Sequence, residues 1–529
     1  MNRIAGALRW LHLVSVWVEQ QPVAVWVVFA VVYWLGLSWI AAAKLMWFDE
    51  LVTYYPARQP AWADVWRYFA EGRDVHTPVS AWLMRLSLSL FGDSHWSLRF
   101  PYLCGYFLMV TGCGCFVARR AGVLWGLVAA SFPLTSSTIY YATEARPYAL
   151  MMGMAAWAAV AWQALGEKRA RPWWLMILGG SLAFAISLHF FAVFLTVPLI
   201  LAEWTRWRER GRRDWMLAAV LLLSPAAYLP FLPGILKGRA IYGGTYWSRP
   251  GLASAEESYR YFLTLALFPF LLAMFIWAVT QPLLGKESGE NSESRQALHF
   301  PREEWVLLTA WCLLPVLMVG GAFFLGAYVP RYALPTMGGL AVLLAVLAWL
   351  RSGNNRWLGL VMSAVFLAWF AYKSQGTARR ELAKNGAYPR QGRNAFATKR
   401  WFTAARESRL PLVVTPAVFF VQLQHYSEEA VSRRMVYLTQ REHARDWDGT
   451  DTGDLGLLNF AIAAPYRIED YGKFLNQETE FLILADTTAP TWHLEQLRRD
   501  GRALRLLVRD GAQSLFVVGQ PQAMPPSEK

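Results

Sequence analysis

The sequence has little charge and little cysteine. Only 17% of its 529 residues are Asp, Glu, Lys or Arg, whereas 55% are hydrophobic. The first 372 residues repeatedly run for 17 to 25 positions without a charged side chain, a pattern that soluble domains seldom show. The four cysteines lie in apolar stretches without metal-ligand or redox spacing, so we expect them to be small core residues. These features exclude a chain of soluble domains and indicate a polytopic membrane protein.

The net charge of +14 resembles that of a nucleic-acid-binding protein, but its location argues against that class. The region from Lys373 to Lys529 holds 22 basic and 18 acidic residues, so most of the excess lies before it. There the basic residues occupy short loops between apolar segments, as the positive-inside rule expects of cytoplasmic loops. We therefore expect membrane lipids, and no nucleic acid, among the partners.

Ten apolar segments, one of which is counted as two spans, predict eleven membrane spans. An odd number of spans would place the two ends of the chain on opposite sides. The segment Trp173–Leu201 has basic residues on both flanks, and 29 residues of helix would be about 44 Å long, too long for one span and short for two. We interpret it as a compressed hairpin, counted as two spans, that breaks near Ser187–His189. The segments are Val23–Lys44, Leu98–Ala118, Val123–Ile139, Tyr148–Leu165, Trp173–Leu201, Trp215–Leu232, Tyr261–Leu284, Trp305–Leu325, Ala333–Leu350 and Trp357–Tyr372.

The sequence predicts an α-helical membrane domain over residues 1–372 and a small extracytoplasmic α/β domain over residues 374–529. Two outer loops, 46–97 and 233–260, are long enough to contribute to a site. In the tail, short β-rich runs alternate with helical stretches, and a hairpin turn is predicted at residues 509–512. The predicted strands are 411–415, 435–439, 481–485, 503–508 and 514–518.

Five groups of polar and aromatic residues lie at the predicted outer ends of the spans. Taken singly, each has an ordinary explanation: interfacial polarity, a helix cap, an aromatic belt with a salt bridge, a snorkelling anchor or a hydrogen-bonded core histidine. Together they suit one outward-facing site, where arginines bind a phosphate and a carboxylate accepts a hydroxyl proton. The candidate residues are Asp49, Glu50, Asp74, His76, Tyr141, Glu144, Arg146, His189, Arg331 and Tyr332.

The same motifs carry a resemblance to a family. Phe48-Asp49-Glu50, Asp74-x-His76-x-Pro78 and Leu98-Arg99-Phe100-Pro101 resemble the first outer loop of C-type (GT-C fold) glycosyltransferases. The bacterial branch near the protein O-mannosyltransferases (glycosyltransferase family 39) and the lipid A aminoarabinose transferase is the most similar. Further matches are Tyr140-Tyr141-Ala142-Thr143-Glu144-Ala145-Arg146, Leu188-His189-Phe190-Phe191-Ala192 and Pro330-Arg331-Tyr332. The chain departs from the branch at His76-Thr77-Pro78-Val79, usually His-Pro-Pro-Leu, and at Ala142-Thr143, usually Ser-Gln.

The resemblance implies transfer of a hexose or pentose from a polyprenyl-phosphate-linked donor to an acceptor hydroxyl, with inversion, outside the bacterial cytoplasmic membrane. Asp49 would be the general base, and Arg146, Arg331 and His76 would neutralise the leaving phosphate. Asp74 and Glu144 would orient the acceptor or help to hold a divalent cation (Mg or Mn), which some relatives use and others do not need, and Asp49 would be a further ligand of that cation beside Glu144. The acceptor could be a glycolipid, a glycan or a protein.

Two functions of other classes compete with this one. A transporter or flippase for a lipid-linked or anionic substrate would place ionisable residues or broken helices near the bilayer midplane, often in two repeated halves. Apart from the break near His189, the sequence shows neither feature. A non-catalytic scaffold or assembly factor would not explain why acids and arginines cluster at the predicted outer ends of the spans.

The predicted topology can be tested with reporter fusions. We expect a periplasmic reporter fused after Ser374 to be active and a cytoplasmic reporter to be silent, because eleven spans carry the chain across the membrane an odd number of times. A fusion after Arg120, in a predicted cytoplasmic loop, should give the opposite pair of signals. A cytoplasmic signal at Ser374 would contradict the outward placement of the site.

Overall fold

A computed structural model shows two units, each built from segments that are distant in the sequence. Unit 1 contains Met1–Ala42, Trp96–Leu232 and Pro250–Arg380, and unit 2 contains Ala43–His95, Pro233–Arg249 and Glu381–Lys529. The domain limits predicted from the sequence remain a prediction. The residues that the structure describes are 13–74, 76–167, 171–244, 246–284, 299–385, 395–487 and 491–521.

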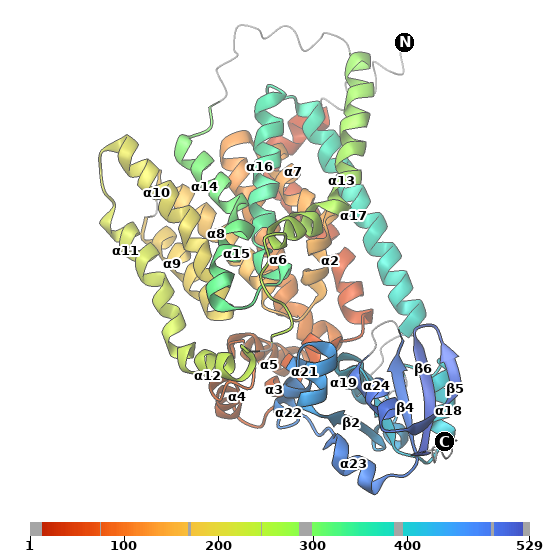
Figure 1. Ribbon diagram of the computed structural model, residues 1–529. Helices are drawn as coiled ribbons and strands as arrows, with labels where there is room; N and C mark the ends of the chain where they lie inside the picture. Colours follow the sequence, from red (N-terminus) through yellow and green to blue (C-terminus); the bar gives the residue numbers. More distant parts are fainter. Residues whose placement is uncertain are drawn as a thin grey trace. The chain divides into compact units, whose positions relative to one another are not determined.

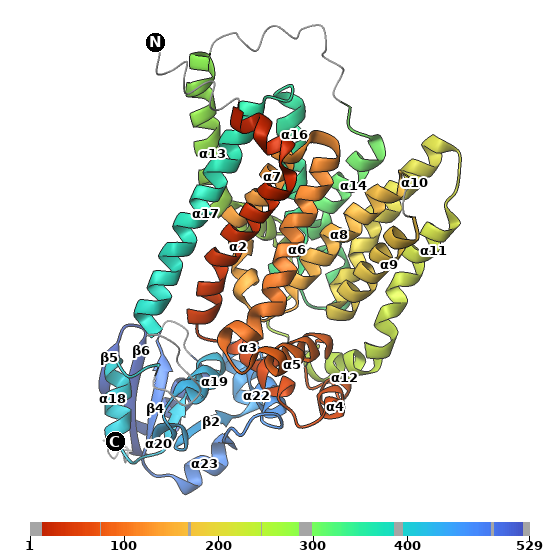
Figure 2. The ribbon, with the colours of Figure 1, turned by 180° about the vertical axis from the view of Figure 1, so that it is seen from behind.

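Unit 1 is a bundle of helices (Figures 1 and 2). Its longer helices are α2 (Pro22–Ala43), α6 (His95–Ala121), α7 (Val123–Ser131), α8 (Tyr148–Leu165), α9 (Arg171–Leu188), α10 (Thr196–Arg210), α11 (Trp215–Leu223), α13 (Ser254–Thr280), α14 (Arg302–Cys312), α15 (Leu314–Leu325), α16 (Thr336–Arg351) and α17 (Arg356–Asn385). Short 3-10 helices join several of them: η1 (Phe132–Thr135), η2 (Ser137–Thr143), η3 (Phe190–Leu195), η4 (Ser224–Phe231), η5 (Gln281–Leu284) and η8 (Pro330–Ala333).

The predicted spans correspond to helices of this bundle. Among the described residues, eight helices are long and apolar enough to cross a membrane, or up to ten if each of two bent pairs is one span. The bends are 82° between α7–η1 and η2 and 51° between α14 and α15. The remaining predicted span is α16, an apolar helix of 16 residues. The fold is therefore that of a multi-pass helical membrane protein, as the sequence predicts.

The prediction of a break near His189 is confirmed, but the prediction of a compressed hairpin is wrong. α9 ends at Leu188, and His189 has an extended backbone before η3 begins. The two arms are 18 and 21 residues long, each of spanning length. The second arm gains its length by continuing through a charged segment to Arg210, where buried and partly buried ion pairs offset the cost of desolvating its arginines.

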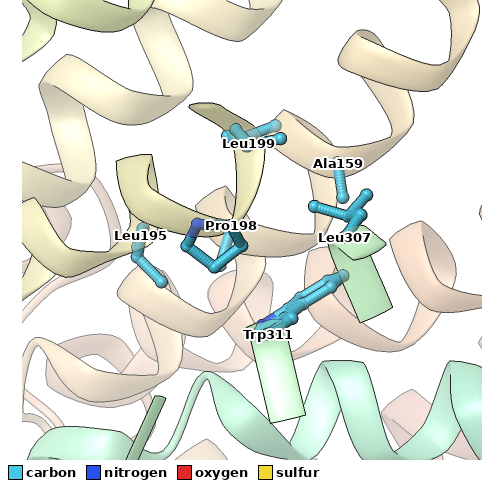
Figure 3. A pocket seen from close by; sticks show the side chains of 8 residues that line it. Ala159, Leu195, Pro198, Leu199, Leu307 and Trp311 are labelled. Atoms are coloured by element: carbon cyan, nitrogen blue, oxygen red, sulfur yellow. The ribbon is translucent and has the colours of Figure 1, made fainter. Parts of the chain in front are cut away.

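Glycines allow α6 and α8 to approach closely in the middle of unit 1. A Cβ atom on Gly153 would lie 2.3 Å from the carbonyl oxygen of Gly105, and one on Gly105 would lie 2.6 Å from the backbone of Leu150. Only glycine fits such a contact between helix backbones. A nearby apolar cavity of about 10 Å³, lined by residues such as Pro198 and Trp311, is barely the size of one water molecule and marks a small packing gap (Figure 3).

A buried network of ion pairs joins α6, α8, α10 and α14 at one end of the bundle. Arg120 donates to Glu304 Oε1 through Nη2 at 2.6 Å, and Gln163 Nε2 donates to Glu304 Oε2 at 3.1 Å. Arg206 contacts Glu203 at 3.1 Å, and its guanidinium lies 3.6 Å from the ring centroid of Trp162. The carboxylate of Glu304 is only 1% exposed, so these partners compensate for a charge that is removed from water.

Unit 2 contains a six-stranded sheet in the order β3-β2-β1-β4-β6-β5. The first four strands in this order are parallel, and β6 pairs antiparallel with both β4 and β5. All five strands predicted from the sequence are present, and the missed strand is β3, which has only three residues at the sheet edge. The strands are β1 (Leu412–Val414), β2 (Met435–Thr439), β3 (Ile468–Asp470), β4 (Phe481–Asp486), β5 (Arg502–Asp510) and β6 (Gln513–Pro521).

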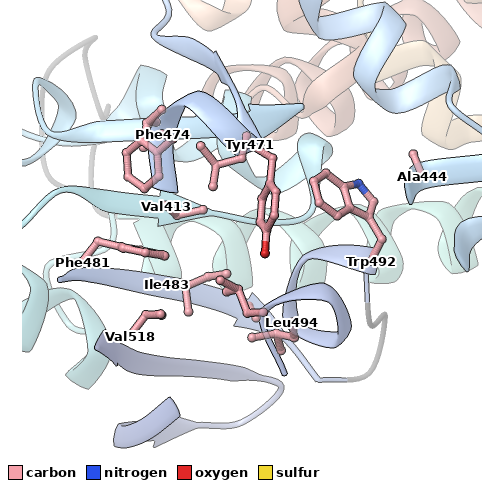
Figure 4. Close-up of a cluster of buried hydrophobic side chains, with 13 residues drawn as sticks. Val413, Ala444, Tyr471, Phe474, Phe481, Ile483, Trp492, Leu494 and Val518 are labelled. Carbon is pink, nitrogen blue, oxygen red and sulfur yellow. The ribbon is translucent and has the colours of Figure 1, made fainter. Parts of the chain in front are cut away.

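Helices pack against this sheet and around it. A buried cluster includes Val413, Ile483 and Val518 of the strands with Tyr471 and Trp492 of the helices (Figure 4). The helices of unit 2 are α3 (Phe48–Ala57), α4 (Trp62–Ala70), α5 (Val79–Phe91), α12 (Leu232–Tyr242), α18 (Arg400–Glu407), α19 (Ala417–Tyr426), α20 (Glu429–Ser432), α21 (Arg441–Asp448), α22 (Thr452–Phe460), α23 (Tyr471–Gln477) and α24 (Trp492–Arg499). As predicted, α5 begins after Pro78.

The buried network predicts a large loss of stability when Glu304 loses its charge. We expect Glu304→Gln to lower the free energy of unfolding by about 3 kcal/mol, because the guanidinium of Arg120 would lose its buried counterion. The thermal midpoint of the purified full-length protein in detergent measures the change. Glu167→Gln is the matched control, since this 42% exposed carboxylate pairs with Arg119 and Arg120 at the surface and should cost less than about 1 kcal/mol. Equal losses for both variants would contradict the role given to Glu304.

Candidate functional site

The candidate site residues fall into two sets, one in each unit. Six of them belong to unit 1: Tyr141, Glu144, Arg146, His189, Arg331 and Tyr332. Four belong to unit 2: Asp49, Glu50, Asp74 and His76. Each set has its own local geometry.

The first set depends on a sharp bend after α7. The Ser136 hydroxyl accepts from the Thr138 N–H at 3.2 Å and so caps η2. The Tyr106 hydroxyl, on α6, donates to the Pro133 carbonyl at 2.9 Å and contacts the Thr138 hydroxyl at 3.0 Å. These buried hydrogen bonds hold the 82° bend and with it the position of Tyr141.

The short turn after η2 carries a buried glutamate and a buried arginine. Glu144 has an extended backbone at the end of η2, and its carbonyl accepts from the Arg146 N–H at 2.8 Å. Pro147 follows and starts α8 at Tyr148. The side chains of Glu144 and Arg146 are 0% and 4% exposed, so both charges are almost fully withdrawn from bulk solvent. Burying these charges costs free energy unless they pair with each other or with a ligand.

Aromatic side chains gather beside this turn. The ring centroids of Tyr141 and Tyr261 lie 6.5 Å apart, and Glu144 and Arg331 lie within electrostatic reach of both tyrosines. The Arg331 guanidinium lies 5.8 Å from the ring centroid of Tyr148. The carboxylate of Glu144, the guanidinium of Arg331 and two phenols therefore share one small region of unit 1.

His189 and Tyr332 complete this set. Their ring centroids are 4.8 Å apart, and the Tyr148 ring lies 5.7 Å from His189 and 6.4 Å from Tyr332. The Phe191 N–H donates to His189 Nδ1 at 3.3 Å, so in the neutral ring the proton is on Nε2. We call Tyr141, Glu144, Tyr148, His189, Tyr261, Arg331 and Tyr332 the tyrosine–arginine cluster.

In unit 2, Asp49 and Glu50 lie in the first turn of α3 and have different environments. Glu50 is 0% exposed, and its Oε2 accepts from the Trp47 N–H at 3.3 Å, so it caps its own helix. Asp49 is half-buried, and its carbonyl accepts from the Thr53 hydroxyl at 3.3 Å. Both carboxylates therefore lie where the partial positive charge of the helix N-terminus is located.

Asp74 and His76 form a hydrogen-bonded pair. Asp74 Oδ1 lies 2.7 Å from His76 Nδ1 and also accepts from the His76 N–H at 2.9 Å. An ionised carboxylate only accepts hydrogen bonds, so Nδ1 carries the proton and Nε2 is the ring atom directed away from Asp74. The side chains are 7% and 12% exposed, so the pair is largely withdrawn from bulk solvent.

Residues of the tail hold the segment that carries Asp49. The Met46 N–H donates to the Tyr426 hydroxyl at 2.8 Å, and Gln422 Nε2 donates to the Met46 carbonyl at 2.8 Å. The Tyr426 hydroxyl also lies 2.7 Å from His95 Nε2, and the Tyr55 hydroxyl lies 3.0 Å from His425 Nδ1. α19 thus binds both backbone groups of a residue three positions before Asp49.

The residues predicted for the site did not include Tyr148 and Tyr261, and the sequence did not predict that α19 anchors the segment before Asp49. The spacing of Gln422, His425 and Tyr426 indicates that the three side chains can contact one partner, because positions i, i+3 and i+4 share one face of a helix. Polar side chains on a face that is otherwise apolar indicate a polar partner. Neither tyrosine could be distinguished from the aromatic residues that are common at membrane interfaces.

The described residues do not supply a complete metal site. No group of three or more His, Cys, Asp or Glu side chains among them is arranged to hold an ion. The two carboxylates predicted to contact a divalent cation, Asp49 and Glu144, belong to different units. The two described cavities are also lined by other residues.

Comparison with known proteins found a family model and solved structures to which the chain is similar. Residues 75–233 match the family model of dolichyl-phosphate-mannose-protein mannosyltransferases. The solved structure of ArnT from Cupriavidus metallidurans in the apo state is similar, with a TM-score of 0.54 and 13% sequence identity over 94% of this chain and 97% of that one. The same protein bound to undecaprenyl phosphate gives a TM-score of 0.51 and 12% identity over 93% and 97%. No curated protein sequence matches the chain.

These comparisons confirm the resemblance and the fold that the motifs predict. The chain has an ArnT-like GT-C fold with a small C-terminal sheet domain. The family match, over residues 75–233, includes His76, the turn that holds Glu144 and Arg146, and His189, but neither Asp49 nor Arg331. The roles of the individual residues remain a prediction.

Acid is expected to destabilise unit 2 through its buried histidines. Burial, with smaller contributions from His95 and Arg58, lowers the pKa of His425 to about 3, and burial lowers that of His493 to about 4. The unfolded chain, with histidine pKa values of about 6.5, binds more protons below that pH, so stability is full above it and falls as the pH drops. For His425 alone the loss at pH 5 is about 2 kcal/mol.

Thermal unfolding of the full-length protein at pH 7 and pH 5 measures this loss. His425→Gln keeps a side chain that can hydrogen-bond Tyr55 but does not titrate, so the difference between the two pH values should shrink in this variant. An unchanged difference would show that His425 does not contribute.

Proposed function

We propose that this protein is a glycosyltransferase that moves a sugar from a polyprenyl-phosphate carrier to an acceptor hydroxyl at the outer face of the bacterial cytoplasmic membrane. The observation that carries the proposal is the tyrosine–arginine cluster, in which the Tyr148 ring lies 5.7 Å from His189, 6.4 Å from Tyr332 and 5.8 Å from the Arg331 guanidinium. Next to it, the buried Arg146 adds a second guanidinium. The family match supports sugar transfer, and the undecaprenyl phosphate bound to ArnT supports a polyprenyl-phosphate donor.

The proposed reaction is a single displacement at the anomeric carbon. The acceptor oxygen forms a bond to that carbon while the bond to the phosphate oxygen breaks, which inverts the configuration. Asp49 takes the proton of the acceptor hydroxyl, for which an ionised carboxylate at a helix N-terminus is suited. The bonding electrons leave with the phosphate, whose negative charge increases during the step.

Cationic side chains stabilise that developing charge. Arg146 and Arg331 can each present several N–H groups to phosphate oxygens, and guanidinium groups remain charged even when buried. His76, whose Nδ1–H is held by Asp74, can donate from Nε2 to the phosphate only as an imidazolium cation. Electrostatic stabilisation of a leaving group in a site from which water is excluded is commonly the largest contribution to catalysis.

The remaining candidate residues bind the sugar and the acceptor. Tyr141 and Tyr332 offer phenol rings and hydroxyls, which pack against sugar rings and hydrogen-bond their hydroxyl groups. His189 would donate from Nε2, and Glu144 and Glu50 would orient hydroxyl groups of the substrates. The described residues lack a metal-binding set, so no step here passes through a cation; activity titrated with Mg, Mn and a chelator tests whether the enzyme uses one.

The loss of Asp49 should abolish transfer. We expect Asp49→Asn to reduce the rate about 10²–10⁴-fold, the usual contribution of a general base, with unchanged expression and membrane insertion. The assay uses purified protein with labelled polyprenyl-phosphate sugars and acceptors identified by lipid and glycan profiling of a deletion strain. Asp64→Asn, a carboxylate in the first turn of α4 in the same loop, is the matched control and should retain activity.

Two results would contradict this proposal. Full transfer by Asp49→Asn would remove its role as the base. Movement of an intact lipid-linked substrate across proteoliposomes, without release of the carrier phosphate, would indicate a transporter or flippase instead.

A further inference from the structure

A second cavity of unit 1 opens between α10 and α11, at the helix ends that the sequence predicts to face the cytoplasm. The two helices run side by side (Figures 1 and 2). The cavity has a volume of about 280 Å³, less than the roughly 300–1,000 Å³ of pockets that enclose whole drug-sized ligands. Its lining residues are Ile200, Glu203, Trp204, Trp207, Arg213, Asp214, Trp215, Ala218, Leu221 and Leu222.

Arg213 is held at the polar end of this cavity by two aromatic rings. Its guanidinium lies 4.3 Å from the ring centroid of Trp207 and 5.4 Å from that of Trp215. A guanidinium stacked on rings keeps its N–H groups available in its own plane, where they match the oxygens of a phosphate. Within the described part of the chain, Arg213 forms no salt bridge, and its side chain is exposed.

The two carboxylates of the cavity already have cationic partners. Asp214 pairs with Arg171 at 2.5 Å and caps α11 by accepting from the Leu217 N–H at 3.1 Å. Glu203 pairs with Arg206 at 3.1 Å and accepts from Trp162 Nε1 at 3.0 Å. These acids therefore do not neutralise Arg213, and the polar end of the cavity stays positive.

The other end of the cavity is apolar and lies further along α11. Along α11 the lining runs from Trp215 to Leu222, about 10 Å of helix. Ile200, Ala218 and Leu221 form its walls, with no charged side chain among them. The exposed rings of Trp204 and Trp215, 48% and 69% exposed, are typical of the membrane interface. The cavity thus joins a cationic mouth at the level of headgroups to an apolar slot at the level of acyl chains.

The surrounding charge is also positive. Arg208 lies 4.6 Å over the Trp204 ring, and neither Arg208 nor Arg212 forms a salt bridge with any described residue. Arg210 and Glu209, by contrast, pair with Glu303 and Arg302 on α14. Three unneutralised arginines within six positions favour a ligand with a net negative charge over a zwitterionic one.

From this geometry we propose that the cavity binds an anionic phospholipid of the inner leaflet. The headgroup phosphate accepts hydrogen bonds from Arg213, and one acyl chain packs between Ile200, Ala218 and Leu221. A soluble phosphate would leave the apolar slot unused, and a neutral lipid would leave Arg213 unused. This site is independent of the proposed sugar transfer and involves none of its residues.

Native mass spectrometry of the delipidated full-length protein, titrated with dioleoyl phosphatidylglycerol, tests the proposal. We expect one saturable adduct on the wild type and about fivefold weaker binding to Arg213→Gln, the effect of one arginine near an anionic headgroup. Arg351→Gln, at the exposed C-terminus of α16 and away from the cavity, is the matched control and should bind like the wild type. Ala218→Trp should also weaken binding, because the larger side chain fills the apolar slot.

Thermal midpoints recorded for all variants separate loss of binding from loss of folding. Equal binding by the wild type, Arg213→Gln and Ala218→Trp would overturn the proposal, because the adduct would then lie elsewhere. Binding of phosphatidylethanolamine as strong as that of phosphatidylglycerol would overturn the choice of an anionic lipid. Displacement by millimolar inorganic phosphate, or by polyprenyl phosphate at lower concentration than phosphatidylglycerol, would assign the cavity to another ligand.

Discussion

The close approach of α6 and α8 is the constraint on which unit 1 depends. A Cβ on Gly153 would lie 2.3 Å from the Gly105 carbonyl, so the two backbones touch where neither helix has a side chain. α8 is consequently the most enclosed of the eight full-length candidate spans described, with 89% of its apolar window buried. Its 18 residues, about 27 Å of helix, connect two polar regions that would otherwise be independent.

Each end of α8 contributes to one of these regions. At its start, Tyr148 lies among the rings of Tyr141, His189 and Tyr332 and beneath the Arg331 guanidinium. At its end, Trp162 and Gln163 contact the buried carboxylates of Glu203 and Glu304. A helix that is fixed at its middle and at one end leaves little freedom at the other, which is the kind of support that a preorganised site requires.

Unit 2 achieves a comparable rigidity with hydrogen bonds instead of close backbone contact. α19 of the tail holds the N–H and the carbonyl of Met46, and Tyr55 of α3 packs against His425, Phe460 and Tyr466. The segment that carries Asp49 therefore folds together with the tail, although more than 300 residues separate them in the chain. This arrangement gives the tail a physical role in placing the proposed base.

Local properties of the sequence were sufficient for much of the fold. Charge-free runs identified the spans because a bilayer excludes charge over a fixed length, and alternating β-rich segments identified five strands of the sheet. The break at His189 followed from basic residues on both flanks of Trp173–Leu201. The length of the second arm did not, because it depends in part on Glu303 of α14 pairing with Arg210, and pairing between residues distant in the sequence leaves no local pattern.

The candidate residues illustrate the same division. The sequence by itself determined which acids, bases and aromatic residues lie near the ends of spans, and their order identified the fold. Only the tertiary structure decided that Glu50 caps its own helix, that Asp74 orients His76, and that Tyr148 and Tyr261 join Glu144 and Arg331. The contacts of Glu50 and Asp74 are local, but they depend on the backbone conformation that the fold imposes. Tyr261 and Arg331 come near Glu144 only through packing between segments that are remote in the chain, which hydropathy and propensity, acting over a few residues, do not reveal.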